Sequence, residues 1–267
     1  MSVFKGKVAV ITGAGSGIGR CLAIQLAEAG ARLAISDINA AGLDATLKAL
    51  PTSTDARSYI VDASSQESVF AHAKEVGNDF GGADYVFNNA GATVVGTFEN
   101  LDVDEIEWQL NINLWGVIYG CKAFLPIMRE QGSGCLVNIS SVFGLVGFPA
   151  QSAYNMSKFA VRGLTECLWQ ELAGSGIQAI TVHPGGIKTN IEKGSRRCRN
   201  AGPTEDKFQR QADDMLVTTP ERCARDILKG VARGRRRILT GKYSRTLYYL
   251  ARLFPNSYFR FIALIAR

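Results

Sequence analysis

Short apolar runs alternate with longer amphipathic segments along most of this 267-residue chain. The runs rich in β-branched residues predict seven strands, at residues 7–12, 32–37, 57–62, 83–88, 135–140, 178–183 and 237–240. The segments between them predict helices at residues 17–29, 41–49, 66–80, 102–130, 153–173 and 220–233. This alternation is typical of βαβ units, whose crossovers place helices on both faces of a parallel sheet. We therefore expect an α/β fold with one doubly wound parallel sheet of seven strands.

The length and composition of the chain predict a single domain. With 46% apolar residues the chain can bury one large core. The N-terminus lacks the apolar run of a signal peptide, and the sequence has no stretch of eighteen apolar residues, so we expect a cytoplasmic protein. Its six cysteines are scattered, and its only histidines are His72 and His183. We therefore expect neither a disulfide framework nor a metal site.

The basic character of the chain is concentrated at its C-terminal end. Residues 235–267 contain eight basic and no acidic residues, so the rest of the chain has 22 basic against 24 acidic residues, a charge of −2. We expect a domain at residues 1–242 and a basic aromatic tail, residues 243–267, that packs on the same domain. Such a tail can also lie on an anionic membrane surface, which we favour less. No nucleic-acid motif accompanies it, so nucleic acid is not an expected partner.

A glycine-rich turn, Thr-Gly-Ala-Gly-Ser-Gly-Ile-Gly at residues 12–19, directly follows the first predicted strand and opens a helix. Glycines let the backbone turn tightly and approach a pyrophosphate, whose charge meets the amides of the helix N-terminus. No Gly-Lys-Ser/Thr follows, so the turn is not a P-loop. The strand, turn and helix together predict a Rossmann-type dinucleotide-binding fold.

The residue that ends the second predicted strand, Asp37, indicates which dinucleotide binds. Its carboxylate can accept hydrogen bonds from both ribose hydroxyls and would repel a 2′-phosphate. The next residues, Ile38 and Asn39, are not basic and could not hold that phosphate. Asp37 therefore favours NAD over NADP, although a helix-capping aspartate would also suit this position.

A tyrosine and a lysine lie four residues apart in a predicted helix. Tyr154 and Lys158 should share one face of that helix. A free phenol has a pKa of about 10, and a cation one turn away favours its ionised form, which makes the phenol a usable acid or base. Ser141 precedes Tyr154 by thirteen residues. An isolated pair of this kind is usually an ordinary surface feature, so its meaning depends on the other motifs.

Together, these motifs resemble those of the classical short-chain dehydrogenase/reductase family from Lys5 to about Thr240. The resemblance rests on their order and spacing: the glycine-rich turn, Asp62-Ala63, Asn88-Asn89-Ala90-Gly91, Asn113, Ser141, Tyr154-Asn155-Met156-Ser157-Lys158 and Pro184-Gly185. It implies an enzyme that transfers a hydride between NAD(H) and a secondary alcohol or ketone. The family habit also implies a homodimer or homotetramer.

The resemblance implies four catalytic residues. Tyr154 would exchange a proton with the substrate oxygen, and Lys158 would lower the pKa of Tyr154 and bind the nicotinamide ribose. Ser141 would hold the reacting oxygen, and Asn113 would anchor a water for proton relay. Asn111 competes with Asn113, whose Leu-Trp-Gly context is the better match, and Ser140 competes with Ser141, which the spacing to Tyr154 favours.

The same transfer gives a set of cofactor contacts. The glycine-rich turn would hold the pyrophosphate, the residues after the third and fourth strands the adenosine half, and those after Pro184 the carboxamide. The full expected set is Gly13, Ser16, Gly17, Ile18, Gly19, Asp37, Asp62, Ala63, Asn89, Ala90, Gly91, Tyr154, Lys158, Pro184, Gly185, Ile187 and Thr189. Gly186 departs from the pattern, since many members have a larger residue there. An asparagine at such a turn can instead only cap the next helix.

Two apolar segments and one basic loop bear on the substrate. Residues 142–149 and 93–95 would flank the reacting carbon and favour a small lipophilic alcohol or ketone. Residues 186–218, here called the lid segment, contain arginines within 195–199 that could attract an acidic thioester. The alternatives are therefore an NADPH-dependent 3-oxoacyl thioester reductase and a non-catalytic dinucleotide-binding regulator. A serine hydrolase is disfavoured because no Gly-x-Ser-x-Gly turn follows a strand.

Overall fold

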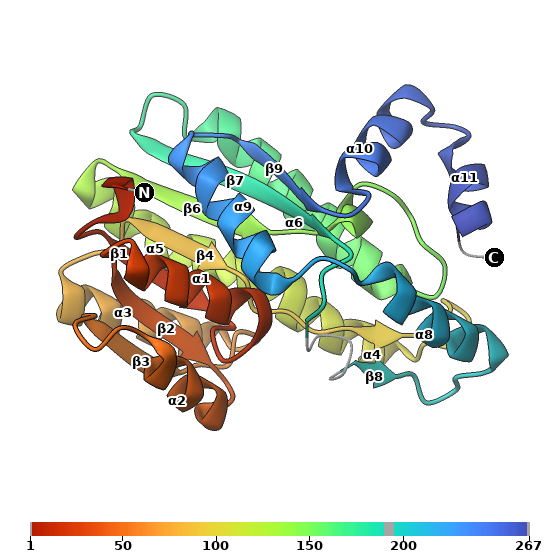
Figure 1. Cartoon of the computed structure of the whole chain (residues 1–267), viewed down its shortest axis with the longest axis horizontal. Helices are drawn as coiled ribbons and strands as arrows, with labels where there is room; N and C mark the ends of the chain where they lie inside the picture. Colours follow the sequence, from red (N-terminus) through yellow and green to blue (C-terminus); the bar gives the residue numbers. More distant parts are fainter. Residues whose placement is uncertain (1, 190–194, 266–267) are drawn as a thin grey trace.

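The computed structural model describes residues 2–189 and 195–265 (Figure 1). Seven parallel strands form one sheet in the order β3-β2-β1-β4-β6-β7-β9, as the alternating pattern predicts. The strands are β1 (Val8–Thr12), β2 (Arg32–Asp37), β3 (Ala56–Ile60), β4 (Tyr85–Asn88), β6 (Gly134–Ile139), β7 (Ile177–Gly185) and β9 (Arg237–Gly241). The expected α/β class and doubly wound sheet are confirmed.

Helices cover both faces of the sheet (Figure 1). One apolar cluster joins the sheet to α1 (Gly17–Glu28), α2 (Ala40–Ala49) and α9 (Pro220–Ala232). The other joins it to α3 (Gln66–Phe80), α5 (Gly116–Gln131) and α6 (Ser152–Glu171). Successive strand residues point to opposite faces, so Ala9 of β1 lies in the first cluster and Val10 in the second. A sheet buried on both faces explains why its strands are continuously apolar.

The strand order reverses beside β1, which pairs with β2 on one side and with β4 on the other. In a doubly wound sheet, ligands bind outside the carboxyl ends of the strands at this reversal. The turns that follow β1, β2, β4 and β6 therefore meet at one edge. That edge carries most of the residues that the sequence marks as functional.

The helix predicted at residues 102–130 is interrupted, which corrects that expectation. The segment contains α4 (Val103–Leu110), a π-helical turn η2 (Asn111–Trp115) and α5. Single π turns inside α-helices are frequent at functional sites. The buried side chain of Asn113 lies in this turn and bonds to the backbone of Ala92 on another segment. Helical periodicity alone could not reveal a turn whose partner is distant in sequence.

The lid segment has secondary structure of its own. Its strand β8 (Arg196–Arg197) pairs in parallel with β5 (Val94–Val95), and its helix α8 (Pro203–Met215) follows. The predicted segment also includes residues 190–194, which lie outside the described residues. The described parts therefore form a second, two-stranded sheet beside the main one.

The tail contains two helices, α10 (Ser244–Leu253) and α11 (Tyr258–Ile265), at one edge of the molecule (Figure 1). Their buried residues Leu247 and Ile262 pack against Val142, Leu145 and Val146. Those three residues belong to or follow the 3-10 turn η3 (Val142–Gly144), directly after Ser141. A shorter 3-10 turn, η1 (Ser2–Phe4), begins the described chain. Among the described residues, no helix has the length and apolarity needed to cross a bilayer.

Candidate active site

The glycine-rich turn forms a close-packed cradle at the start of α1. Gly13 has φ +67°, a left-handed conformation that favours glycine. A Cβ on Gly19 would lie 2.2 Å from the carbonyl oxygen of Gly13, so only glycine fits there. Ser16 is the N-cap of α1, yet its side chain makes no capping hydrogen bond. The Ser16 hydroxyl and the first amides of α1, which include those of Gly17 and Ile18, are therefore suited to an anion.

The Asp37 carboxylate links the glycine-rich turn to the end of β2. Its two oxygens accept hydrogen bonds from the backbone amides of Gly15 and Asn39, each at 2.9 Å. A Cβ on Gly15 would lie 2.8 Å from the nearer oxygen, so this glycine allows the close approach. The contacts fix the carboxylate at the mouth of the turn. Asn39, and not Asp37, caps α2 by accepting a bond from Gly42, which removes the capping interpretation of Asp37.

Thr12 joins the carboxyl ends of β1 and β4. Its hydroxyl oxygen accepts hydrogen bonds from the backbone amides of Asn89 and Ala90, both at 3.0 Å. The Asn89 side-chain amide donates to the Thr12 carbonyl at 2.9 Å. Ala90 also lies close to Gly13, because a Cβ added to Gly13 would be 2.8 Å from the Cα of Ala90. The structure thus brings Asn89 and Ala90 against the glycine-rich turn.

Asp62 and Ala63 lie at the same edge, after β3. One Asp62 oxygen accepts hydrogen bonds from the Ser64 amide at 2.8 Å and the Ser64 hydroxyl at 2.6 Å, so Asp62 also shapes its own turn. A Cβ on Gly116, the first residue of α5, would lie 2.8 Å from the Ala63 carbonyl oxygen, so the start of α5 packs closely on Ala63. A contact between this pair and adenine stays a prediction.

Asn113 is fully buried in the π turn, and two hydrogen bonds to the backbone of Ala92 fix its amide group. Its oxygen accepts from the Ala92 amide and its nitrogen donates to the Ala92 carbonyl, both at 2.8 Å. A Cβ on Gly91 would lie 3.3 Å from the Asn113 oxygen and 3.7 Å from Lys158 Nζ. Asn111, the competing asparagine, is exposed. The structure therefore places Asn113, and not Asn111, beside Gly91 and Lys158.

Tyr154 and Lys158 lie one turn apart on α6, with Lys158 Nζ 5.4 Å from the centre of the Tyr154 ring. The lysine is 3% exposed, and its ammonium donates to the Ile139 carbonyl at the end of β6, at 3.0 Å. Burial penalises the charged form and lowers the pKa of Lys158 to about 8. A cation with so few solvent contacts interacts strongly with neighbouring groups.

Ser141 and Ser140 have different partners. The Ser140 hydroxyl donates to the Lys158 carbonyl at 2.8 Å, so it ties β6 to α6. Ser141 is the N-cap of η3, and its hydroxyl oxygen accepts from the Phe143 amide at 3.1 Å. That bond uses the hydroxyl as an acceptor and leaves its proton available for another group. Of the two serines, the geometry favours Ser141 as the one that meets a substrate.

The end of β7 and the segment after it bring further predicted residues towards the cradle. Thr189 lies beside Gly17, because a Cβ added to Gly17 would be 3.4 Å from the Cβ of Thr189. The side chain of Ile187 packs in the apolar core, so only its backbone can face a ligand. Pro184 and Gly185 pair with the end of β9. Gly186 has φ +58°, which explains why this chain has glycine where larger residues are expected.

Two positioning residues were not predicted from the sequence. Asn155, next to Tyr154, donates to the carbonyls of Phe143 and Val146, both at 2.7 Å, and accepts from the Phe148 amide at 3.2 Å. It therefore holds the loop after Ser141. His183 is buried in β7 and bonds to the backbone of Ser141. Asn155 could have been suspected from its place in the Tyr154 motif, but His183 has no local signal.

The apolar residues of the segment 142–149 are divided between the core and the surroundings of Tyr154. Val142, Leu145 and Val146 are buried beneath the tail. Phe143 and Phe148 stay half-buried and stack with ring centres 5.0 Å apart, and Phe143 meets the Tyr154 ring edge-on at 6.0 Å. Phe208 of α8 lies 5.9 Å beyond Phe148. An aromatic wall, defined here as Phe143, Phe148 and Phe208, thus extends from Tyr154 towards the lid segment.

The lid arginines have partners within the fold. Arg196 lies over the Trp108 ring at 3.8 Å. Arg197 pairs with Asp206, and Arg199 pairs with acidic residues at the start of α4, including Asp102 at 3.0 Å. These contacts anchor the lid segment on the domain. They also weaken the case for an acidic thioester substrate, because Arg197 and Arg199 already pair with carboxylates.

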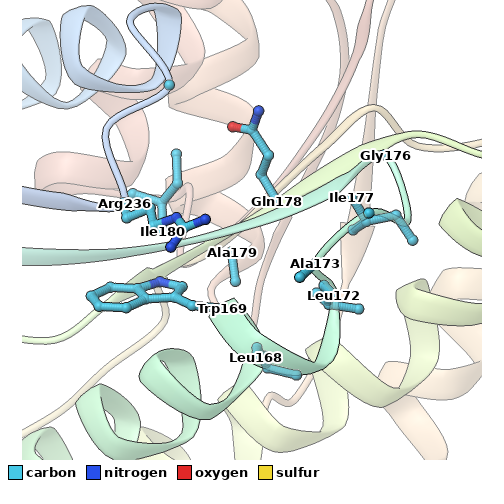
Figure 2. A pocket seen from close by; sticks show the side chains of 12 residues that line it. Leu168, Trp169, Leu172, Ala173, Gly176, Ile177, Gln178, Ala179, Ile180 and Arg236 are labelled. Atoms are coloured by element: carbon cyan, nitrogen blue, oxygen red, sulfur yellow. The ribbon is translucent and has the colours of Figure 1, made fainter.

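A cavity of about 350 Å³ lies elsewhere, at the amino end of β7 (Figure 2). Figure 2 shows Trp169 of α6 and Arg236, which precedes β9, on the same side of it. The remaining lining comes from the end of α6, the turn after it, the start of β7 and Gly234. Because the candidate site occupies the carboxyl ends of the strands, this cavity is separate from it.

The fold and the site define an oxidoreductase of the Rossmann type. The model of the short chain dehydrogenase family matches residues 7–200, and the chain belongs to the short-chain dehydrogenase/reductase family. SadH, a proposed oxidoreductase of Mycobacterium tuberculosis, is 44% identical to this chain over an alignment of 271 positions. The alignment covers 98% of this chain and 96% of SadH. Levodione reductase of Leifsonia aquatica is 38% identical over 73% of this chain and 74% of that protein.

Solved structures agree with this assignment. A short-chain dehydrogenase/reductase of Burkholderia phymatum, in complex with NAD, has a TM-score of 0.87 and 30% identity, with 95% of each chain covered. The crystal structure of a levodione reductase has a TM-score of 0.80 and 29% identity, and covers 91% of this chain and 99% of that one. The expected family is confirmed by both kinds of comparison.

Proposed function

We propose that this protein transfers a hydride between NAD(H) and a lipophilic secondary alcohol or ketone. The observation that carries the proposal is the meeting of Tyr154, Lys158 and Asn113 at the carboxyl edge of the sheet, with Lys158 Nζ 5.4 Å from the Tyr154 ring. Two family relatives, one named an oxidoreductase and the other levodione reductase, support it. So does the neighbour solved with NAD.

The residues present fit a nicotinamide dinucleotide. The cradle at Gly13 and Gly19 has no room for a Cβ, and the Ser16 hydroxyl makes no capping bond, as a pyrophosphate site requires. Asp37 stands at the mouth of the turn, where its carboxylate would accept from ribose hydroxyls and repel a 2′-phosphate. Lys158 and Thr189 would meet the nicotinamide half. When bound, the cofactor supplies or accepts the hydride.

The side chains of this chain would manage the proton and the developing charge. Tyr154 would pass its phenolic proton to a carbonyl oxygen during reduction, or take a proton from an alcohol during oxidation. The Lys158 ammonium would stabilise the phenolate that remains. Ser141 would donate its hydroxyl proton to the same oxygen and stabilise its negative charge. Asn113, held by Ala92, would position a water behind Lys158.

The surroundings of Tyr154 favour an apolar substrate. The aromatic wall contacts Tyr154 through Phe143, and the lid arginines Arg197 and Arg199 pair with carboxylates. A lipophilic ketone can bury apolar surface against this wall, whereas an acidic thioester would find Arg197 and Arg199 already paired with carboxylates. We also expect a homodimer or homotetramer, which sedimentation velocity can measure.

A fluorescence screen tests the proposal. Alcohols and ketones graded by chain length and ring content are offered with NAD(H) and with NADP(H), and NADH formation or loss is followed. We expect turnover of apolar compounds with NAD(H). Measurable NAD binding with no turnover of any compound by either cofactor would instead support a dinucleotide-binding regulator.

A further inference from the structure

The two tail helices have one face on the domain and another in solvent. Leu247 and Ile262 are buried against the loop after Ser141, and the Tyr258 hydroxyl accepts a hydrogen bond from the Gly147 amide at 3.3 Å. The Tyr248 hydroxyl accepts a bond from Arg237 at 3.1 Å, which ties α10 to β9. These contacts give the tail a fixed position on the domain.

Several large apolar residues of the tail are exposed. Phe254 is 50% exposed and Phe259 is 57% exposed, values that mark them as surface residues despite their large rings. Phe254 also contacts Phe261 across the bend between the two helices, with ring centres 6.4 Å apart. The set here called the tail face comprises Tyr243, Tyr249, Leu253, Phe254, Phe259 and Phe261, all exposed. Exposed apolar groups gathered in one short segment indicate an interaction surface.

The charges around the tail face have a single sign. Four exposed basic residues are interleaved with it: Lys242, Arg245, Arg252 and Arg260. No acidic residue occurs from Arg235 to Arg267. Two of the arginines lie over aromatic rings of the tail, Arg252 over Tyr248 at 5.9 Å and Arg260 over Phe259 at 6.0 Å. Basic side chains beside exposed aromatic rings are the pattern of interfacial helices.

We propose that the tail face docks this protein on the surface of an anionic membrane. The aromatic and leucine side chains would enter the headgroup boundary, and the arginines would bind lipid phosphates. With 10 and 8 residues, α10 and α11 are too short to span a bilayer and suit a position in its surface. The packed face would stay on the domain, so docking requires no rearrangement of the tail.

The charge pattern favours a membrane over a second copy of the chain. Two tail faces placed against each other in a symmetric dimer would bring like charges together without acidic partners from the tail. An anionic lipid surface instead satisfies both the basic and the apolar groups. The occupant we infer is therefore a bilayer that contains acidic lipids.

Vesicle sedimentation of the full-length protein tests this inference. The probes are phosphatidylcholine vesicles with and without phosphatidylglycerol, at low and high salt. We expect binding only to the anionic vesicles, and weaker binding at high salt because exposed charges are screened. Arg245→Glu with Arg260→Glu should weaken it at least about tenfold, since each basic residue near the surface contributes measurably. Lys48→Glu with Lys74→Glu is the matched control, which changes the net charge equally on exposed sites of α2 and α3.

A second pair of variants tests the apolar part. Phe254→Ser with Phe259→Ser should lower binding to anionic vesicles, whereas Phe70→Ser with Phe98→Ser, also exposed, should not. Sedimentation velocity of each variant monitors assembly. The inference is overturned if the wild type ignores anionic vesicles, if both charge variants weaken binding equally, or if the tail variants change the oligomer while vesicle binding is unaltered. None of these residues belongs to the proposed catalytic site, so a failed inference leaves the proposed function untouched.

Discussion

The imidazole of His183 bonds to the backbone carbonyl of Ser141, with Nδ1 2.9 Å from the oxygen. A carbonyl can only accept, so Nδ1 carries the proton and Nε2 accepts from the Thr181 hydroxyl at 3.2 Å. Burial lowers the pKa of His183 to about 4, which keeps the ring neutral at physiological pH. His183 thus fixes the backbone that presents Ser141, and we regard it as a positioning residue.

Replacing His183 should affect turnover more than cofactor binding. His183→Leu removes the donor, and we expect kcat to fall about tenfold as Ser141 shifts, with little change in the Kd for NADH. His183→Asn keeps an amide donor and should recover most of the loss. Steady-state kinetics and fluorescence titration separate the two effects. Equal losses in both variants would mean that the ring only fills space.

Tyr154→Phe should abolish most turnover while NADH still binds. The ring and its edge-on contact with Phe143 are kept, and only the proton-transfer group is lost. We expect kcat to fall by about 10²–10⁴-fold, the usual contribution of a general acid or base. Stopped-flow turnover and NADH fluorescence test this, and a kcat near the wild-type value would disprove the proposed proton transfer.

Asp37→Ser combined with Ile38→Arg should shift preference towards NADP. The carboxylate that would repel a 2′-phosphate is removed, and a cation is placed beside it at an exposed position. We expect the NADP-to-NAD ratio of kcat/KM to rise by one to two orders of magnitude, because like-charge contacts cost several kcal/mol. Val3→Arg, at an exposed position of η1 before the amino end of β1, is the control and should leave the ratio unchanged.

Lys158→Met should stabilise the protein at pH 7 and abolish its activity. Below pH 8 the folded and unfolded chains both hold the ammonium proton, so the full penalty of burying the charge applies. Between about 8 and the usual 10.5 only the unfolded chain holds it, and the wild type gains stability as pH rises. The difference between the pKa values of the folded and unfolded chains corresponds to about 3 kcal/mol of unfolding free energy. Denaturant unfolding from pH 7 to 10 should show the gap between variant and wild type closing.

His72→Phe should stabilise the protein, most clearly in acid. His72 is buried in α3 between Tyr59 and Phe124, and neither ring nitrogen has a hydrogen-bond partner among the described residues. Burial lowers its pKa from 6.5 to about 4, so as pH falls through this window the unfolded chain binds the proton first and stability is lost. We expect a gain of about 1–3 kcal/mol at pH 7 from removing the unpaired polar atoms.

The pH dependence distinguishes this effect from better packing alone. The variant should lose less stability than the wild type between pH 6.5 and 4, as measured by thermal unfolding. The variant would still lose some stability in acid, because burial lowers the pKa of His183 in the same way. A stability gap that stays constant with pH would show that the protonation of His72 does not contribute.

The sequence predicted the sheet and the glycine-rich turn between β1 and α1 well, because both depend on local signals. Apolar runs mark the strands, and the turn at residues 12–19 has its chemistry in consecutive residues. The π turn at Asn113 was missed because its cause, the backbone of Ala92, is distant in sequence. His183 and the paired lid arginines were missed for the same reason. Contacts made by the tertiary fold leave no periodic pattern in the chain.

The pairing of β5 with β8 has a consequence for how the protein folds. The two strands come from distant parts of the chain and are only two residues long, with the Arg196 amide bonded to the Thr93 carbonyl and the Cys198 amide to the Val95 carbonyl. Contacts so distant in sequence form slowly, because a large loop must close before they add any stability. We expect this small sheet to assemble last and to open first in hydrogen exchange, while the seven-stranded sheet stays intact.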